Sequence, residues 1–205
     1  MQSLKTKFIL SVVVFFYSCD TKPENLPYLY EKEVLSPGDT LYYTIPDWEF
    51  INQDEKEITS TDYEGKIWIA DFFFTHCPTI CPFITSNLKK VQDVTSEFSV
   101  YFVSFTVDPK NDTPERFRTY IDKNGIDTRN WNFLTGEKTD LYHLGEYGFK
   151  QLVQEKVNEP GGFLHSPYLS LIDKEGHVRG IYDGTDNKEI DKLVNDIKTL
   201  LKEYE

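Results

Sequence analysis

The stretch DFFFTHCPTICPF, residues 71–83, joins a strand to a helix and places two cysteines at the junction. The preceding run KIWIADFFF, residues 66–74, is almost continuously apolar, which is typical of a strand buried on both faces. Between about residues 79 and 97, apolar side chains recur at helical spacing, at Phe83, Ile84, Leu88, Val91 and Val94. The pattern predicts a buried strand and then an amphipathic helix, with Cys77 at its N-terminal mouth and Cys81 in its first turn.

Strand-like and helix-like segments alternate outward from this junction. Apolar runs predict strands in residues 41–52, 57–65, 99–107, 131–136, 149–155, 167–173 and 177–184. Capping residues and helical spacing predict helices at 112–125, 137–148 and 187–204. The segment DKEG, residues 173–176, indicates that the last two strands form a hairpin.

This order of elements predicts an α/β protein with a thioredoxin-like fold. Consecutive parallel strands joined by helical crossovers give a central mixed sheet with helices on both faces. The first strands add an N-terminal strand or hairpin extension. Sites in such sheets lie at the carboxyl ends of the strands, and Cys77 falls just beyond one of them.

The first 19 residues, MQSLKTKFILSVVVFFYSC, have the features of an export signal. Two lysines precede an apolar run that is about half of the roughly 20 residues a spanning helix needs. The boundary FYSC resembles a bacterial lipoprotein processing site, so we predict a signal peptide over residues 1–18 and a lipidated N-terminus at Cys19. The alternative is an uncleaved anchor with an incidental cysteine. Both predict a membrane-anchored domain outside the cytoplasmic membrane, on its periplasmic side.

The segment after the signal is predicted to be a tether. Residues 19–39 are polar and contain three prolines, so we expect them to hold a domain formed by residues 40–205 off the membrane. The chain carries 34 acidic against 22 basic residues, a formal charge of -12. This acidity argues against a nucleic-acid partner, which requires a basic face.

The cysteine pair admits three interpretations: a disulfide staple, a redox dithiol, or part of a metal site. A bridge between Cys77 and Cys81 closes a very short loop, which in the chain-entropy model stabilises least, so a staple is disfavoured. The positive end of the helix favours thiolates, which both attack disulfides and bind metals. The three intervening residues exceed the two of thioredoxin-type redox sites. The wider bite suits a bridging metal and still permits a disulfide.

A metal site needs a third ligand, and the chain has four histidines. His165, in GGFLHSPYLSLID, immediately precedes an apolar strand, where a thioredoxin-like fold brings a loop against the cysteines. His76 adjoins Cys77, but its side chain is expected to diverge. His143 and His177 are expected to be surface residues. The sequence therefore favours His165 as the ligand.

Two further features admit a structural and a functional interpretation. Asp108 and Asp112, in VDPKNDTPE, are most simply a turn and a helix N-cap, because Asp and Thr before proline are ordinary capping residues. Pro167 falls near the position at which thioredoxins carry a cis-proline facing the cysteines. A trans proline on an edge strand is the alternative.

Four segments together resemble the Sco/SenC family: FFFTHCPTICP, FVSFTVDPKNDTPE, FLTG and LHSPYLSLIDKEG. They occur in the family's order and spacing, and the resemblance covers roughly residues 40–203. It implies a membrane-tethered, thioredoxin-fold protein that binds copper and helps to assemble cytochrome c oxidase. The family's metal cysteines fall on Cys77 and Cys81, and its metal histidine on His165. The implied partner is the copper-site subunit of a terminal oxidase or another copper protein.

One residue departs from the family pattern. The metal histidine is usually preceded by aspartate, and here the position holds Leu164. An aspartate orients or charge-tunes an imidazole, so its loss bears more on Cu(II) than on Cu(I). The ligand types agree independently with copper, because thiolates select Cu(I) and imidazole also suits copper. Zinc wants a fourth ligand for a closed site, and none is evident.

We therefore hypothesise a copper metallochaperone that transfers copper from Cys77, Cys81 and His165 to the thiolates of another protein. Transfer by ligand exchange predicts a site near the surface. The alternative is a thiol–disulfide oxidoreductase, in which Cys77 attacks a partner's disulfide and Cys81 resolves the mixed disulfide. A peroxidase is disfavoured, because peroxiredoxins generally set a threonine three residues before the reactive cysteine. Here Thr75 is only two before Cys77.

Overall fold

The computed structural model describes residues 25–36 and 38–205, so the predicted signal peptide and Cys19 lie outside the described residues. The strands are β1 (Lys32–Ser36), β2 (Asp39–Tyr42), β3 (Glu49–Asn52), β4 (Glu57–Thr59), β5 (Ile67–Phe73), β6 (Val100–Thr106), β7 (Trp131–Thr135), β8 (Val153–Glu155), β9 (Phe163–His165), β10 (Tyr168–Ile172) and β11 (Val178–Asp183). The helices are α1 (Cys81–Val94), α2 (Pro114–Asn124), α3 (Lys138–His143) and α4 (Asn187–Lys202), with short turns η1 (Ser60–Tyr63), η2 (Leu144–Gly148) and η3 (Pro160–Gly162).

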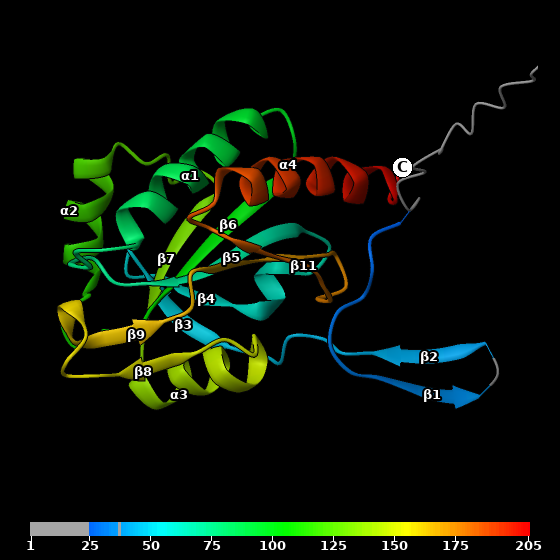
Figure 1. Cartoon of the computed structure of the whole chain (residues 1–205), viewed down its shortest axis with the longest axis horizontal. Helices are drawn as coiled ribbons and strands as arrows, with labels where there is room; N and C mark the ends of the chain where they lie inside the picture. Colours follow the sequence, from blue (N-terminus) through cyan, green and yellow to red (C-terminus); the bar gives the residue numbers. More distant parts are fainter. Residues whose placement is uncertain (1–24, 37) are drawn as a thin grey trace, which may run out of the picture.

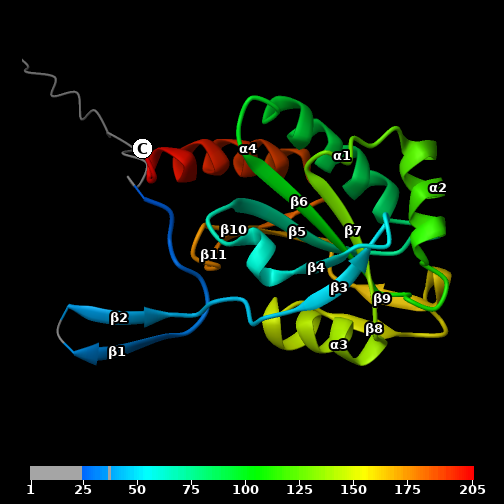
Figure 2. The same cartoon turned by 180° about the vertical axis from the view of Figure 1, so that it is seen from behind.

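A seven-stranded mixed sheet forms the centre of the molecule, in the order β11-β10-β5-β6-β7-β3-β4. Strands β5, β6 and β7 are parallel, whereas β10 runs antiparallel to β5 and β3 runs antiparallel to β7. Helices α1 and α4 cover one face, and α3 with the β8–β9 hairpin lies across the other (Figures 1 and 2). The predicted central sheet with helices on both faces is confirmed.

The central strand β5 is buried at every position, which explains its continuous apolar sequence. Helix α1 begins at Cys81, with Pro82 in its first turn, where a missing N–H removes no helical bond. Helix α2 is capped by Thr113, whose hydroxyl accepts the backbone N–H of Arg116. It ends at Gly125, whose φ of 58° lies in the left-handed region that favours glycine.

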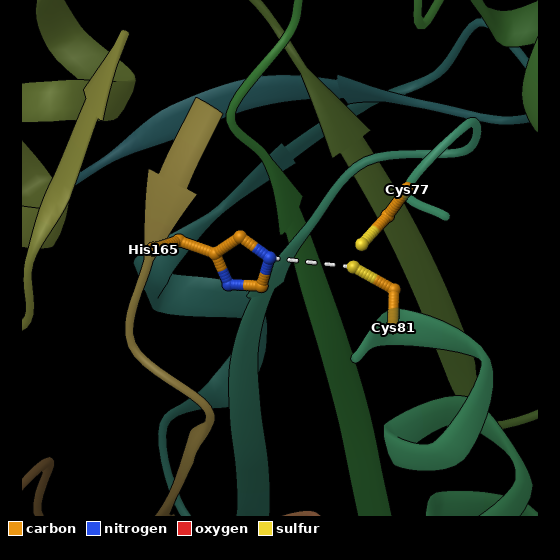
Figure 3. Close-up of side chains that lie close together, drawn as sticks. All are labelled: Cys77, Cys81 and His165. Atoms are coloured by element: carbon orange, nitrogen blue, oxygen red, sulfur yellow. Dashed lines mark hydrogen bonds between the residues drawn. The ribbon is translucent and has the colours of Figure 1, made fainter. Parts of the chain in front are cut away.

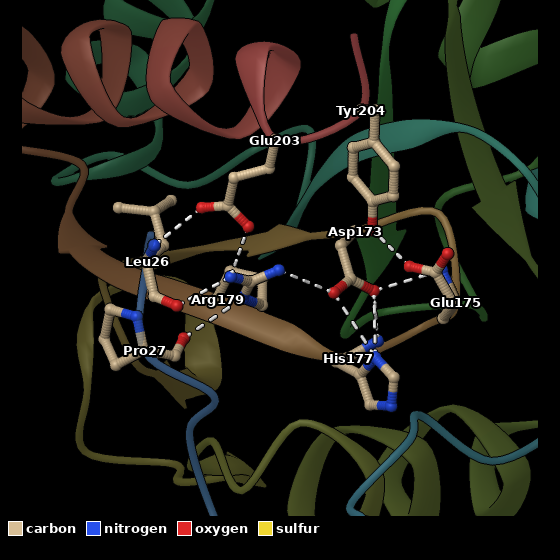
Figure 4. A network of polar contacts seen from close by, with 8 residues as sticks. All are labelled: Leu26, Pro27, Asp173, Glu175, His177, Arg179, Glu203 and Tyr204. Atoms are coloured by element: carbon tan, nitrogen blue, oxygen red, sulfur yellow. Dashed lines mark hydrogen bonds and ion pairs between the residues drawn. The ribbon is translucent and has the colours of Figure 1, made fainter. Parts of the chain in front are cut away.

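The predicted tether is structured over its second half. Strand β1 pairs antiparallel with β2 in a two-stranded ribbon that projects from the domain (Figure 1). Leu26 is only 8% exposed, and the guanidinium of Arg179 donates to the carbonyls of Leu26 and Pro27 (Figure 4). The packed domain therefore begins near Leu26 rather than at residue 40. Composition missed this boundary because the partner, Arg179, lies 153 residues away from Leu26.

The structure shows whether Pro167 is cis and whether Asp108 and Asp112 form a turn and a helix cap. None of the described residues has a cis peptide bond, so Pro167 is trans. The turn at Asp108 forms as predicted, with the backbone N–H groups of Asn111 and Asp112 donating to its carbonyl. The cap, however, is Thr113 alone, and Asp112 is fully buried. Among the described residues, no helix combines the length and apolar character that a membrane crossing requires.

Candidate metal centre

Strand directions bring the three predicted ligands to one edge of the sheet. Cys77 follows the carboxyl end of β5, and Cys81 begins α1. Because β10 runs antiparallel to β5, its first residues lie at that same edge, and His165 comes just before them at the end of β9. Figure 3 shows the imidazole of His165 facing the two sulfurs across this edge.

The donor atoms are close enough to share one ion. The two sulfurs and a ring nitrogen of His165 all lie within 4.8 Å of one another, and Nε2 of His165 is 3.3 Å from Sγ of Cys81. Both cysteines are free thiols in the structure. We call Cys77, Cys81 and His165 the cysteine cluster.

The cysteine cluster is more buried than ligand exchange at a surface predicts. The exposed fractions are 9% for Cys77, 5% for His165 and 1% for Cys81. A groove next to α2, lined by both cysteines, gives access to the cluster. Cys77 is the better exposed cysteine, so an incoming group meets its sulfur first.

The orientation of His165 follows from its second ring nitrogen. Nδ1 lies 3.0 Å from the carbonyl oxygen of Ser166. A carbonyl only accepts hydrogen bonds, so Nδ1 carries the proton and the lone pair resides on Nε2, which faces Cys81. The ring also meets Phe74 edge-on, with centroids 5.8 Å apart. The imidazole is thus held in the tautomer that metal ligation requires.

The two thiols differ in acidity because they share a hydrogen bond. The hydrogen bond from Cys81 lowers the pKa of Cys77 to about 3, against the effect of burial. The same hydrogen bond, with burial and the charge of Cys77, raises the pKa of Cys81. Cys77 is therefore the more acidic of the two thiols, and Cys81, which faces Nε2 of His165, is the one that keeps its proton.

Asp71 is a buried carboxylate near the cluster that the sequence analysis did not single out. It is 4% exposed in the middle of β5, and Oδ1 accepts the hydroxyl of Ser104 at 2.5 Å. Burial raises its pKa to about 6, and the hydrogen bond from Ser104 opposes the rise. An acid inside the apolar run KIWIADFFF was the available signal.

Asp112 accepts hydrogen bonds from the loop that joins β5 to the cysteines. Its carboxylate accepts the backbone N–H of Thr75 at 3.1 Å and the hydroxyls of Thr75 and Thr106 at 2.5 and 2.6 Å. Burial raises the pKa of Asp112, and these hydrogen bonds oppose the rise. The carboxylate therefore ties the loop that leaves β5 to the end of β6. Sequence reasoning had treated it as a capping residue.

The other histidines lie outside the cysteine cluster. His76 diverges as predicted, with Nε2 3.6 Å from Oδ2 of Asp108. His143 is exposed on α3, also as predicted. The prediction for His177 was wrong, because it is half-buried and its Nδ1 lies 3.2 Å from Oδ1 of Asp173. With Glu175 these two residues form a second group of ligand-type side chains, which we call the carboxylate cluster.

The donor set of the cysteine cluster fits a soft metal ion. Two sulfurs and one imidazole nitrogen suit Cu(I), whereas a closed zinc site takes four protein ligands. Among the described residues, no histidine, cysteine or carboxylate joins these three as a fourth ligand. The residues present therefore fit copper better than zinc.

Sequence comparison assigns the chain to a family over a region that contains the cysteine cluster. The family model described as SCO1/SenC matches residues 39–202, which include all three members of the cysteine cluster. The chain belongs to the SCO1/SenC family. The predicted resemblance is confirmed over almost the whole described domain.

Solved structures of the SCO1/SenC family superpose on this chain. A SCO1/SenC family lipoprotein from Bacillus anthracis is 38% identical, with a TM-score of 0.72, over 78% of this chain and 95% of that one. BsSco, described with a disulfide switch and as a member of the Sco family of cytochrome c oxidase assembly proteins, is 30% identical with a TM-score of 0.70, over 77% and 93%. ScoI from Arabidopsis thaliana with copper bound is 24% identical with a TM-score of 0.65, over 76% and 99%, a likeness that shows the fold.

Proposed function

We propose that this SCO1/SenC protein binds one copper ion through the cysteine cluster and delivers it to a copper site of cytochrome c oxidase or of another copper protein. The observation that carries the proposal is the convergence of two sulfurs and one imidazole nitrogen within 4.8 Å. The copper-bound ScoI structure and the description of BsSco as an oxidase assembly protein support it by family.

The three members of the cysteine cluster have different roles in binding and releasing copper. The thiolates of Cys77 and Cys81 hold Cu(I), and Nε2 of His165 supplies the third donor. A three-coordinate site leaves room for an incoming sulfur, so copper moves by exchanging one ligand at a time. Cys77 is nearest to solvent and is the first ligand that a partner's thiolate replaces.

The test of copper binding uses the reduced protein titrated with Cu(I) in competition with zinc. We expect one copper per chain, with two sulfurs and one nitrogen in X-ray absorption spectra. His165→Ala should weaken binding, and His143→Ala, which changes an exposed histidine on α3, serves as the matched control. Binding to His165→Ala as tight as to the unmodified protein would rule out the proposed ligand set.

Copper loading should depend on the redox state of the cysteines. A disulfide between Cys77 and Cys81 removes both thiolates, so the oxidised protein should not bind Cu(I) until a thiol reductant is added. The disulfide switch described for BsSco supports this expectation. Stoichiometric binding of Cu(I) to protein with no free thiols would contradict the assignment of the cysteines as ligands.

A thiol–disulfide oxidoreductase is the second candidate, favoured by the asymmetry of the two thiols. The thiolate of Cys77 attacks one sulfur of a partner's disulfide, forms a mixed disulfide and releases the partner's other sulfur as a thiolate. Cys81 then loses its proton and attacks the sulfur of Cys77, which releases the second partner thiolate. Exchange should largely survive His165→Ala, whereas copper delivery should not.

Membrane attachment and location are proposed from the sequence signal. We propose that the signal peptide, residues 1–18, is removed and that lipidated Cys19 anchors the domain on the periplasmic side, with residues 19–25 as the remaining tether. The 38% identical lipoprotein from Bacillus anthracis supports the proposal. Mass spectrometry of the native protein should find an acylated Cys19 at the N-terminus, and an intact Met1 would contradict it.

A further inference from the structure

A groove of about 340 Å³ opens beside the two cysteines, between the start of α1 and helix α2. Cys77 and Cys81 line one side of it, and Arg116, Tyr120 and Lys123 line the side formed by α2. It gives the sulfurs of the cysteine cluster a route to solvent. A molecule that reaches these sulfurs through the groove passes along α2.

The groove is lined by basic side chains, although the protein as a whole is acidic. The chain has 34 acidic and 22 basic residues, so acidic side chains outnumber basic ones in the molecule as a whole. Arg116 and Lys123 are charged residues of its lining, and no carboxylate of the described chain lines it. The approach to the cysteines is thus locally basic on an acidic molecule.

Helical spacing explains how the two cations reach the groove. Positions 116, 120 and 123 are four and three residues apart and share one face of α2. The acidic neighbours Glu115 and Asp122 are adjacent in sequence to the cations and point elsewhere, because consecutive helical residues do not face each other.

Neither cation is neutralised by contact with an acid. Within residues 25–36 and 38–205, neither Arg116 nor Lys123 forms an ion pair. Nε of Arg116 donates to the hydroxyl of Thr75 at 3.1 Å, which fixes the guanidinium at the cysteine loop. The carboxylate of Asp112 lies behind Thr75 and is fully buried. Lys123 is exposed and free to meet a ligand.

We propose that this groove docks a carboxylate-bearing segment of the partner protein next to Cys77, with Arg116 and Lys123 binding its acidic side chains. The proposal rests on the proposed function, because it takes the two cysteines as the atoms that exchange with the partner.

The test measures thiol–disulfide exchange of the full reduced chain with three small disulfides of different charge. Dithiodipropionate carries two carboxylates, bis(hydroxyethyl) disulfide is neutral, and cystamine carries two ammonium groups. In each reaction Cys77 forms a new S–S bond to the probe and the probe's S–S bond breaks. Cys81 then closes the protein disulfide, and two electrons have reduced the probe to two thiols. The readout is the rate with each charged probe divided by the rate with the neutral probe.

Removal of the two cations should change these ratios selectively. In Arg116→Gln/Lys123→Gln, the ratio for dithiodipropionate should fall about fivefold at low ionic strength, and the ratio for cystamine should rise, in line with electrostatic steering. The difference should shrink as salt screens the charges. Arg116→Lys should retain the ratio. Lys123→Gln alone should give part of the effect, because within the described residues the Lys123 side chain makes no hydrogen bond, unlike that of Arg116.

The control variant makes the same change of charge far from the groove. Lys188 and Lys198 are exposed on α4, so Lys188→Gln/Lys198→Gln should leave all ratios unchanged. Ratios that stay constant in the groove variant, or that fall equally in the control, would overturn the docking proposal. Failure of the unmodified protein to bind copper and to react with the neutral probe would instead overturn the proposed function.

Discussion

The cysteine cluster and the carboxylate cluster lie at opposite ends of β10 and differ in what already contacts their donor atoms. In the cysteine cluster the sulfurs and Nε2 of His165 face chiefly one another. In the carboxylate cluster, Asp173 accepts two backbone N–H groups, an imidazole nitrogen of His177 and the guanidinium of Arg179 at 3.0 Å (Figure 4). The carboxylate of Glu175 likewise accepts a hydrogen bond, from the hydroxyl of Tyr204.

The comparison teaches that proximity of ligand-type residues does not make a metal site. A cation entering the carboxylate cluster would have to displace Arg179, which already supplies the positive charge there. Arg179 also donates to Glu203 at 2.7 Å and to the carbonyls of Leu26 and Pro27. The carboxylate cluster is therefore part of a clamp that joins the N-terminal segment to β11 and to the end of α4.

The largest expected effect is the loss of copper from the cysteine cluster. Cys77→Ser/Cys81→Ser removes both thiolates and should abolish stoichiometric binding of Cu(I). Glu175→Gln/His177→Asn, the matched change in the carboxylate cluster, should leave one copper per chain. Competition titration against a Cu(I) chelator measures both variants. Copper retained by the serine variant, or lost from the other, would erase the distinction between the clusters.

The next effect is on stability and belongs to the clamp. Arg179→Met leaves the buried Asp173 and the partly buried Glu203 without their cation, and it should lower the free energy of unfolding by about 3–5 kcal/mol. Copper stoichiometry should not change. Urea denaturation measures the loss, with Lys188→Met at an exposed site of α4 as the control. A loss equal to that of the control would show that the clamp does not stabilise the fold.

Asp71 lacks such a cation, and its effect should depend on pH. Burial raises its pKa from 3.8 to about 6, so the folded state holds the proton more tightly than the unfolded state. Stability is therefore lost as pH rises from about 4 to 6, by about 3 kcal/mol from the size of the shift. Asp71→Asn should abolish this loss. Unfolding free energies of both proteins at pH 4 and 7 give the comparison, and a difference independent of pH would contradict it.

The smallest effect concerns the support of the cysteine loop. Thr75→Val removes the hydroxyl that donates to Asp112 and should cost about 1–3 kcal/mol, because the buried carboxylate loses a donor. Thr75→Ser keeps the hydroxyl and should recover most of the loss. Chemical denaturation compares the two variants. Equal stability of Thr75→Val and Thr75→Ser would show that this hydrogen bond is replaced, for example by water.

Much of the fold could be predicted because its signals are local. The apolar run of β5, the spacing in α1, the proline and glycine that bound α2, and the turn before β11 each lie within one short segment. The ribbon of β1 and β2 could not be predicted as part of the domain. Residues 19–39 are polar and contain three prolines, like a linker, and the side chain that holds Leu26 and Pro27 is that of Arg179, far along the chain.

The sequence by itself determined the chemistry of the cysteine cluster, because two cysteines after a buried strand and a histidine before another strand fix the ligand types and their edge of the sheet. Only the tertiary structure decided the rest. It buried the sulfurs, set the proton of His165 on Nδ1 through Ser166, and turned Arg116 and Lys123 toward the cysteines. These features depend on contacts between segments distant in sequence, and burial and pKa follow from such contacts rather than from residue type.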